Sequence, residues 1–215
     1  MSPLIDFHTH KPTAEGVITP RCFGVHPWYS AEHGLDWYAA NREQFENAEI
    51  IGECGLDKCC DTPWQVQYQV FMWQIEIAEQ LGKPLVLHCV HAFNELMQLR
   101  RSHSATPWVV HGFTGSPELY RQLLANGIEV SFGAALMQPW RKKLLGTFAT
   151  VAPDRIFLET DDSGANIADI YRTAAALLQI TTESLCDAIN AHYHTLLGHL
   201  TANRHETVRH NNNSQ

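Results

Sequence analysis

The stretch from residue 64 to residue 89, WQVQYQVFMWQIEIAEQLGKPLVLHC, contains the signals of a helix followed by a strand. Apolar side chains recur at helical spacing over residues 64–81, at Val66, Val70, Ile77, Ala78 and Leu81. Gly82 stands where a helix needs a C-terminal glycine cap, and Pro84 prevents the helix from continuing. The apolar run over residues 84–89 then predicts a buried strand.

The same alternation extends along the chain. Strand-like apolar runs recur at residues 3–7, 16–19, 22–25, 49–52, 84–89, 107–110, 128–132 and 155–158. Helical patterns separate the later runs, and the pattern over residues 118–126 again ends at a glycine, Gly127. Strands that alternate with helices indicate parallel strands covered by helices.

The set of strand-like runs predicts an α/β fold, a (β/α)8 TIM-type barrel. Its early part is compressed, because the segment from Lys11 to Arg21 has room for a short strand but for no full helix. We therefore expect shortened early outer helices. A chain of 215 residues with 45% hydrophobic content suits one domain. We expect this domain over residues 1–200, followed by a polar, flexible tail over residues 201–215.

Composition narrows the classes of function. The formal net charge is −8, from 15 Lys and Arg against 23 Asp and Glu, which argues against a broad basic surface that coats a duplex. No apolar run approaches the roughly 18–20 residues needed to span a membrane, and the first residues lack the basic start and apolar region of a signal peptide. The six cysteines form no CxxC pair. We expect a reduced, cytoplasmic protein that makes no membrane contact.

Potential metal ligands follow several of the predicted strands. His8 and His10 are two residues apart, so on a strand their side chains face the same side and can converge. Taken alone, such a pair is more often solvated than metal-bound. Further histidines and carboxylates occupy the ends of other strands: Glu53 and Asp57, His88, His111, and Glu159 with Asp161 and Asp162. In a (β/α)8 barrel these ends meet at one rim, so the joint pattern predicts a metal site.

At this point the sequence resembles the TatD family of metal-dependent hydrolases. The matching pieces are DFHTH, GVHPW, GECGLD, KPLVLHC, VVHGFTGS and LETD, in family order over residues 6 to 162. The resemblance implies a TIM barrel with a two-metal site. It also implies phosphodiester chemistry, since many similar proteins are deoxyribonucleases that remove nucleotides from single-stranded ends.

Carried over position by position, the resemblance implies a ligand set. His8, His10 and Asp161 would bind the first metal, Glu53 would bridge both metals, and His88 and His111 would bind the second. The expected cofactors are two divalent ions, Mg²⁺ first, with Zn²⁺ or Mn²⁺ also suited to this many imidazoles. Asp161 and Glu53 are the expected catalytic carboxylates, with Asp161 orienting or deprotonating a water. Asp57 is expected to support the ligands, and His26, in GVHPW, is the expected substrate-contacting histidine.

Three departures from the family pattern lie near the expected substrate rim. Lys58 stands where an aromatic residue often follows GLD, His91 stands in the region where an arginine is common, and DDSG lacks the usual proline. We predict that Trp28 stacks on a base and that Lys58 contacts a phosphate. The alternatives are that Trp28 packs within a rim loop and that Lys58 is a solvated lysine.

The resemblance, together with this ligand set, implies a divalent-metal-dependent phosphodiester hydrolase, best described as a deoxyribonuclease acting on single-stranded or frayed DNA ends. The expected partner is therefore a nucleic acid, most simply single-stranded DNA; the sequence identifies no protein partner. The alternative is a metal-dependent hydrolase of the same fold that acts on an amide, lactone or small phosphoester. A non-enzymatic subunit of a nucleic-acid complex is a third class, but a pure scaffold has no physical need for six metal ligands.

Overall fold

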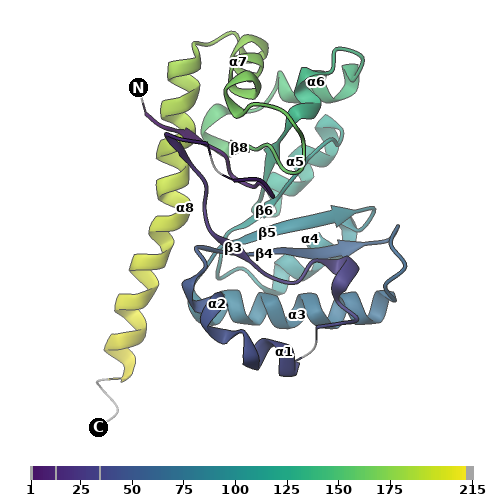
Figure 1. Ribbon diagram of the computed structural model, residues 1–215, viewed down its shortest axis with the longest axis vertical. Helices are drawn as coiled ribbons and strands as arrows, with labels where there is room; N and C mark the ends of the chain where they lie inside the picture. The colour runs from purple at the N-terminus through teal and green to yellow at the C-terminus, as the bar shows by residue number, and fades with distance from the viewer. Residues whose placement is uncertain (1, 13, 34, 212–215) are drawn as a thin grey trace.

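The computed structural model describes residues 2–12, 14–33 and 35–211 (Figure 1). Within this part of the chain, parallel strands alternate with helices in the order that the sequence predicts. The strands are β1 (Leu4–Ile5), β2 (Val17–Ile18), β3 (Cys22–Phe23), β4 (Ile50–Asp57), β5 (Leu85–Val90), β6 (Trp108–Val110), β7 (Ile128–Phe132) and β8 (Ile156–Leu158). Each predicted strand-like run overlaps one of them.

The strands form a curved parallel sheet that follows the order of a TIM-type barrel. Strands β3 to β8 pair consecutively, and β1 pairs with β2. Backbone hydrogen bonds join β1 to β8, because Phe7 N donates to Leu158 O over 2.9 Å and Asp161 N donates to His8 O over 2.9 Å. Within the described residues, the strands thus form two sheets, which an isolated bridge between Thr9 and Asp161 links after β1 and β8. The predicted (β/α)8 TIM-type fold is confirmed.

The helices are unevenly distributed around the barrel. No helix separates β1, β2 and β3 in the described residues, so the shortened early outer helices are confirmed. The α-helices are α1 (Leu35–Ala40), α2 (Arg42–Asn47), α3 (Trp64–Leu81), α4 (Phe93–Ser102), α5 (Pro117–Ala125), α6 (Lys142–Phe148), α7 (Ile167–Leu178) and α8 (Thr182–Asn211). Three short 3-10 helices are η1 (Pro27–Tyr29), η2 (Ala134–Met137) and η3 (Pro153–Arg155).

Two of these elements show how local sequence determines local structure. Helix α3 has the predicted bounds and ends at Gly82, whose φ of 66° is the left-handed conformation that glycine adopts without strain. Strand β4 is longer than the predicted run at residues 49–52 and continues to Asp57. Glu53 therefore lies inside β4, next to a shift in its register with β5, rather than after its last residue.

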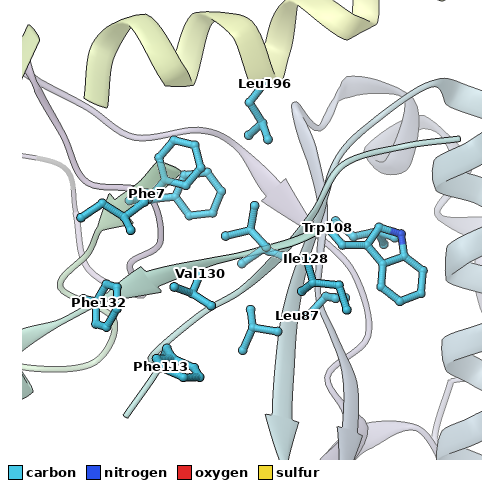
Figure 2. Packing of buried hydrophobic residues seen from close by; sticks show 14 of the residues in the cluster. Phe7, Leu87, Trp108, Phe113, Ile128, Val130, Phe132 and Leu196 are labelled. Atoms are coloured by element: carbon cyan, nitrogen blue, oxygen red, sulfur yellow. The ribbon is translucent and has the colours of Figure 1, made fainter. Parts of the chain in front are cut away.

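Aromatic and branched side chains fill the core between the strands and around them. Phe7 stacks on Phe157 with ring centroids 4.2 Å apart, which joins β1 to β8 by packing as well as by hydrogen bonds. Figure 2 shows Phe7, from the segment after β1, near Val130 and Phe132 of β7, with Leu196 of α8 pointing toward them. Each fully buried side chain of this size contributes about 1.5–3 kcal/mol by leaving water. This packing holds the strand ends in place.

Helix α8 runs along one side of the molecule and lies against the N-terminal strand (Figure 1). The Asn190 side chain donates to Pro3 O over 2.7 Å, and the Cys186 thiol contacts Ser2 O and Pro3 O. The backbone of residues 201–211 continues α8, whereas residues 212–215 lie outside the described residues. The division into a domain over 1–200 and a flexible tail stays a prediction.

In the described part of the chain, none of the helices combines the length and apolar character that crossing a lipid bilayer demands.

Candidate metal centre

The carboxylate of Glu53 lies at the centre of a group of five imidazoles. Its Oε2 is 3.2 Å from His8 Nε2 and 3.3 Å from His10 Nε2. Its Oε1 is 2.7 Å from His111 Nε2, and the other two nitrogens that face it are His88 Nδ1 at 2.9 Å and His26 Nε2 at 3.2 Å. Imidazoles from β5 and from the segments that follow β1, β3 and β6 thus converge on one carboxylate of β4, as the C-terminal ends of barrel strands allow.

Asp161 completes this group from the segment after β8. Its Oδ1 is 3.5 Å from His10 Nε2 and 4.0 Å from His8 Nε2, and its Oδ2 is 4.0 Å from His111 Nδ1. The hydrogen bond from Asp161 N to His8 O places the residue beside the end of β1. The structure therefore brings together all six residues that the sequence predicts as ligands.

Buried carboxylates outside this group lie beside two of the imidazoles. Asp57 Oδ2 lies 3.2 Å from His88 Nε2 and accepts from Trp28 Nε1 over 2.8 Å. Glu159 is fully buried, and its Oε1 lies 3.6 Å from His111 Nδ1. Such partners fix the tautomer and ring orientation of a metal-binding histidine.

Glu159 is a buried carboxylate beside the site to which the sequence analysis assigned no role. Its Oε1 accepts from Gly112 N over 2.6 Å, and its Oε2 accepts from Ser131 Oγ over 2.5 Å. The sequence signal was its place at the end of an apolar strand, two residues before Asp161. What the sequence could not show is that these contacts with β6 and β7 bury it.

The electrostatics of the group follow from burial and close contact. Burial by itself would raise the pKa of Glu53, but hydrogen bonds with His111, His26, His8 and His88 outweigh it and lower that pKa far below its usual range. For His111, burial acts to lower the pKa, yet the carboxylates of Glu159 and Glu53 raise it overall. Burial raises the pKa of Asp161. The surroundings thus act in opposite directions on the two carboxylates, since the pKa of Glu53 is lowered and that of Asp161 is raised.

Helix α3 positions two of the segments that carry site residues. Gln74 accepts from Val25 N over 2.7 Å and donates to Val25 O over 3.0 Å, immediately before His26. Gln67, two turns earlier, accepts from Asp57 N over 2.8 Å and donates to Asp57 O over 3.0 Å. Both glutamines are buried. Each glutamine side chain thus makes the two hydrogen bonds that a neighbouring strand would otherwise make to this backbone.

The donor set fits divalent metal ions. Three groups of ligand atoms lie within 4.8 Å of one another: His8, His10 and Glu53; His8, His111 and Asp161; and His26, Glu53 and His88. Imidazole nitrogens together with carboxylate oxygens suit Zn²⁺, Mn²⁺ and related divalent ions. His111 Nδ1 is buried and makes no hydrogen bond within the described part of the chain. His26, which the sequence analysis expected only to contact substrate, belongs to the third of these groups. How the ligands are divided between two ions stays a prediction.

Two cavities meet at this group. The first, about 430 Å³, is lined by Glu53 and His26 together with aromatic residues from β3 to α1, including Phe23, Trp28 and Trp37. The second, about 380 Å³, lies between the segments that follow β5 and β6 and reaches Phe113 and Gly115. His88, His111 and Asp161 line both. A ligand that crosses the centre can therefore extend to either side of it.

The predicted substrate-contacting residues lie in different places. Trp28 lines the first cavity beside His26 and remains 53% exposed although its indole nitrogen is bonded to Asp57. Lys58 lines neither of these two cavities, because its ammonium group bonds to Glu95 Oε1 over 2.5 Å and lies 5.4 Å from the ring centre of Trp64. Its predicted phosphate contact remains a prediction.

One contact within the first cavity was absent from the sequence-based predictions. The rings of His33 and Trp37 stack there with centroids 4.5 Å apart and nearly parallel planes. The four-residue spacing of the two residues, across the start of α1, is the only sequence signal that could have indicated it.

Solved structures with a similar fold include YJJV, a TatD homolog from Escherichia coli K12, with a TM-score of 0.71 and 20% identity; the match covers 86% of this chain and 78% of that one. A hydrolase TatD family protein from Entamoeba histolytica matches with a TM-score of 0.69 and 18% identity, over 84% of this chain and 74% of that one. At these identities the likeness shows the fold alone.

Curated relatives are similar at the level of sequence. A protein from Erwinia billingiae named 3'-5' ssDNA/RNA exonuclease TatD is 33% identical over 150 residues, which is 64% of this chain and 55% of that protein. A human protein named 3'-5' RNA nuclease TATDN2 is 30% identical over 152 residues, 65% of this chain and 19% of that protein. The chain thus spans about half the length of the first of these relatives and less of the second.

A family model described as TatD related DNase matches residues 12–207, which is most of the chain. The chain belongs to the TatD family of metal-dependent hydrolases.

Proposed function

We propose that the protein is a divalent-metal-dependent phosphodiester hydrolase that acts on single-stranded or frayed ends of a nucleic acid, DNA first. The observation that carries the proposal is the Glu53 carboxylate surrounded by five imidazoles, with Asp161 beside them where two cavities meet. The names of the relatives, ssDNA/RNA exonuclease and RNA nuclease, support the substrate class.

The proposed cofactors are two divalent ions, with Mg²⁺ as the first candidate and Mn²⁺ or Zn²⁺ as the others. His8, His10 and Asp161 would hold one ion, His88 and His111 the other, and Glu53 would contact both. When bound, such ions neutralise the charge of a phosphodiester and lower the pKa of a bound water. The local positive charge would then come from the ions, which reconciles an anionic substrate with a chain of net charge −8.

Asp161 is the proposed general base. Its side chain is 33% exposed and lines both cavities, so a water that approaches a phosphate at the junction can donate to it. Glu53, with its strongly lowered pKa, remains a fixed negative charge that holds the imidazoles together.

The first cavity is the proposed place for the base of the nucleotide next to the scissile phosphate. Trp28 is exposed there, and His26 lies 4.9 Å from it, ring centre to ring centre. Trp37 and His33 form a second flat surface in the same cavity. Flat aromatic surfaces bind bases by stacking with little preference for their identity, which suits an exonuclease.

The cytoplasmic location and the absence of membrane contact remain predictions from the sequence.

The experiment that tests this proposal compares substrates under defined metals. Purified protein loaded with Mg²⁺, Mn²⁺ or Zn²⁺ is given labelled single-stranded DNA, RNA, blunt duplex DNA and a panel of small phosphoesters, amides and lactones. We expect stepwise shortening of the single strands, faster than cleavage of the duplex, and loss of activity in chelator. Hydrolysis confined to the small-molecule panel under every metal would instead establish the alternative hydrolase.

A further inference from the structure

Residues 140–143, Trp-Arg-Lys-Lys, place an indole and three adjacent cations on the surface at the start of α6, after η2. Trp140 is 73% exposed, and Arg141, Lys142 and Lys143 are all exposed. Arg141 donates to the Gln138 side chain, but none of the three cations forms an ion pair with a residue that the structure describes. We call residues 140–143 the β7–α6 patch.

The charge of this patch contrasts with that of much of the described surface. Several exposed cations elsewhere are paired with carboxylates, as in Arg21 with Glu49, Arg42 with Glu46, Lys58 with Glu95, Arg121 with Glu118 and Arg172 with Asp169. The sequence contains no Asp or Glu between Glu129 and Asp154. The patch is therefore a local concentration of positive charge in a chain of net charge −8, and no acidic residue lies near it in the sequence.

The patch lies on the same face of the barrel as the metal centre. It belongs to the connection that leaves the C-terminal end of β7, and such connections form the active-site face of a barrel. Gly133, at the start of this connection, lies against Glu159, the carboxylate that faces His111. Helix α6, which begins within the patch, bonds through Thr147 Oγ1 to Gly115 O over 3.1 Å, and Gly115 lines the second cavity. The seven-residue separation of Gly133 and Trp140 limits their distance to about 25 Å.

We infer that the β7–α6 patch is a second binding site for the single-stranded nucleic acid, which holds the part of the strand that lies beyond the second cavity. Arg141, Lys142 and Lys143 bind successive phosphates, and Trp140 stacks on a base. An exposed aromatic ring beside unpaired cations is the combination that binds single strands without regard to sequence. The inference rests on the proposed function, since it extends the same substrate across the same face.

The test measures binding of strands of two lengths, separately from cleavage. A fluorescent phosphorothioate thymidine 12-mer and the corresponding 3-mer are titrated with Mg²⁺-loaded protein at several salt concentrations. We expect Trp140→Ala to weaken 12-mer binding by roughly 5- to 150-fold. We expect Arg141→Gln/Lys142→Gln/Lys143→Gln to reduce the slope of log K against log salt by about 2, since each phosphate contact on a single strand contributes about 0.7. Binding of the 3-mer should change by less than about twofold, because it fills only the metal centre and its cavities.

The matched control removes three cations from the opposite face. Arg21, Arg101 and Arg155 precede strands or end a helix there, so Arg21→Gln/Arg101→Gln/Arg155→Gln changes the net charge equally without touching the patch. Equal loss of 12-mer binding in this control, or unchanged 12-mer binding in both patch variants, would overturn the inference. Melting temperatures show whether each variant is folded. If the triple variant is unstable, Lys142→Gln alone replaces it, because a single substitution of an exposed residue disturbs folding less.

Wild-type binding distinguishes the second binding site from the catalytic activity itself. If wild-type protein cleaves single-stranded DNA but binds the 3-mer and the 12-mer with equal affinity, the proposed function stands and the second binding site is wrong. If wild-type protein binds neither oligonucleotide under any metal, both proposals fall. Vesicles that contain phosphatidylserine provide the last comparison: binding to them that is lost in the triple variant, with 12-mer binding intact, would assign the patch to an anionic membrane and overturn the nucleic-acid role.

Discussion

At the scale of single residues, Glu53 and Asp57 are two carboxylates of one strand with different surroundings. Glu53 faces five imidazoles, whereas Asp57 contacts only His88 among them and is otherwise bonded to Trp28 Nε1 and Cys59 N. We expect Glu53→Gln to abolish activity and to weaken metal binding, because a neutral amide is a poor bridge between cations. Asp57→Asn should weaken metal binding only by the roughly 10- to 100-fold typical of a supporting residue. Elemental analysis after dialysis against Mn²⁺ measures both; equal metal loss in the two variants would show that Asp57 is itself a ligand.

Trp28 has two separable properties at the same scale, an exposed ring and an indole N–H that is bonded to Asp57. We expect Trp28→Ala to weaken oligonucleotide binding by about 1–3 kcal/mol through loss of stacking. Cleavage of a phosphodiester that lacks a base should change little. Trp28→Phe keeps a stacking ring and loses the N–H, so it should retain most of the binding. If Trp28→Phe is impaired as strongly as Trp28→Ala on both substrates, the role of Trp28 is to hold Asp57 rather than to bind a base.

At the scale of elements, α3 acts on the site through the backbone. Gln74 satisfies both the N–H and the C=O of Val25, next to His26. We expect Gln74→Leu to lower the free energy of unfolding by about 2–4 kcal/mol, because two buried backbone groups lose their partners. For a chain of this size that corresponds to a fall in melting temperature of roughly 5–15 °C. Gln69→Leu, on the exposed face of the same helix, is the control and should leave the melting temperature nearly unchanged.

At the scale of the whole molecule, the candidate ligands come from segments spread over residues 8 to 161, so bound ions would link strands from all around the barrel. Ligands that bind only the folded state stabilise it, by about 2.7 kcal/mol at a metal concentration of 100 times the dissociation constant. We expect chelation to lower the melting temperature by roughly 5–10 °C. Glu53→Ala should show no such metal-dependent difference. A melting temperature that is the same with and without metal in the wild type, at saturating Mn²⁺, would contradict the predicted centre.

Much of this protein is determined by its sequence alone, because the relevant signals are local. The spacing of apolar residues from Val66 to Leu81, with Gly82 after them, predicts α3 to its last residue, and the strand-like runs predict every strand of the barrel. The alternation of His8 and His10 places both on one face of the chain, and the family resemblance supplies the other ligands, which the structure brings together around Glu53.

Other features were decided only by the tertiary structure, because they depend on residues far apart in the chain. The extension of β4 to Asp57 follows from pairing with β5 and from the Gln67 side chain, neither of which the local pattern of residues 49–52 contains. His26 lies beside Glu53 in a segment whose backbone, at Val25, is bonded to Gln74, 49 positions away. Lys58 is paired with Glu95, 37 positions later, so a lysine that reads as a phosphate contact in the sequence already has a carboxylate partner. Burial and charge pairing arise between segments, and no local pattern encodes which segments meet.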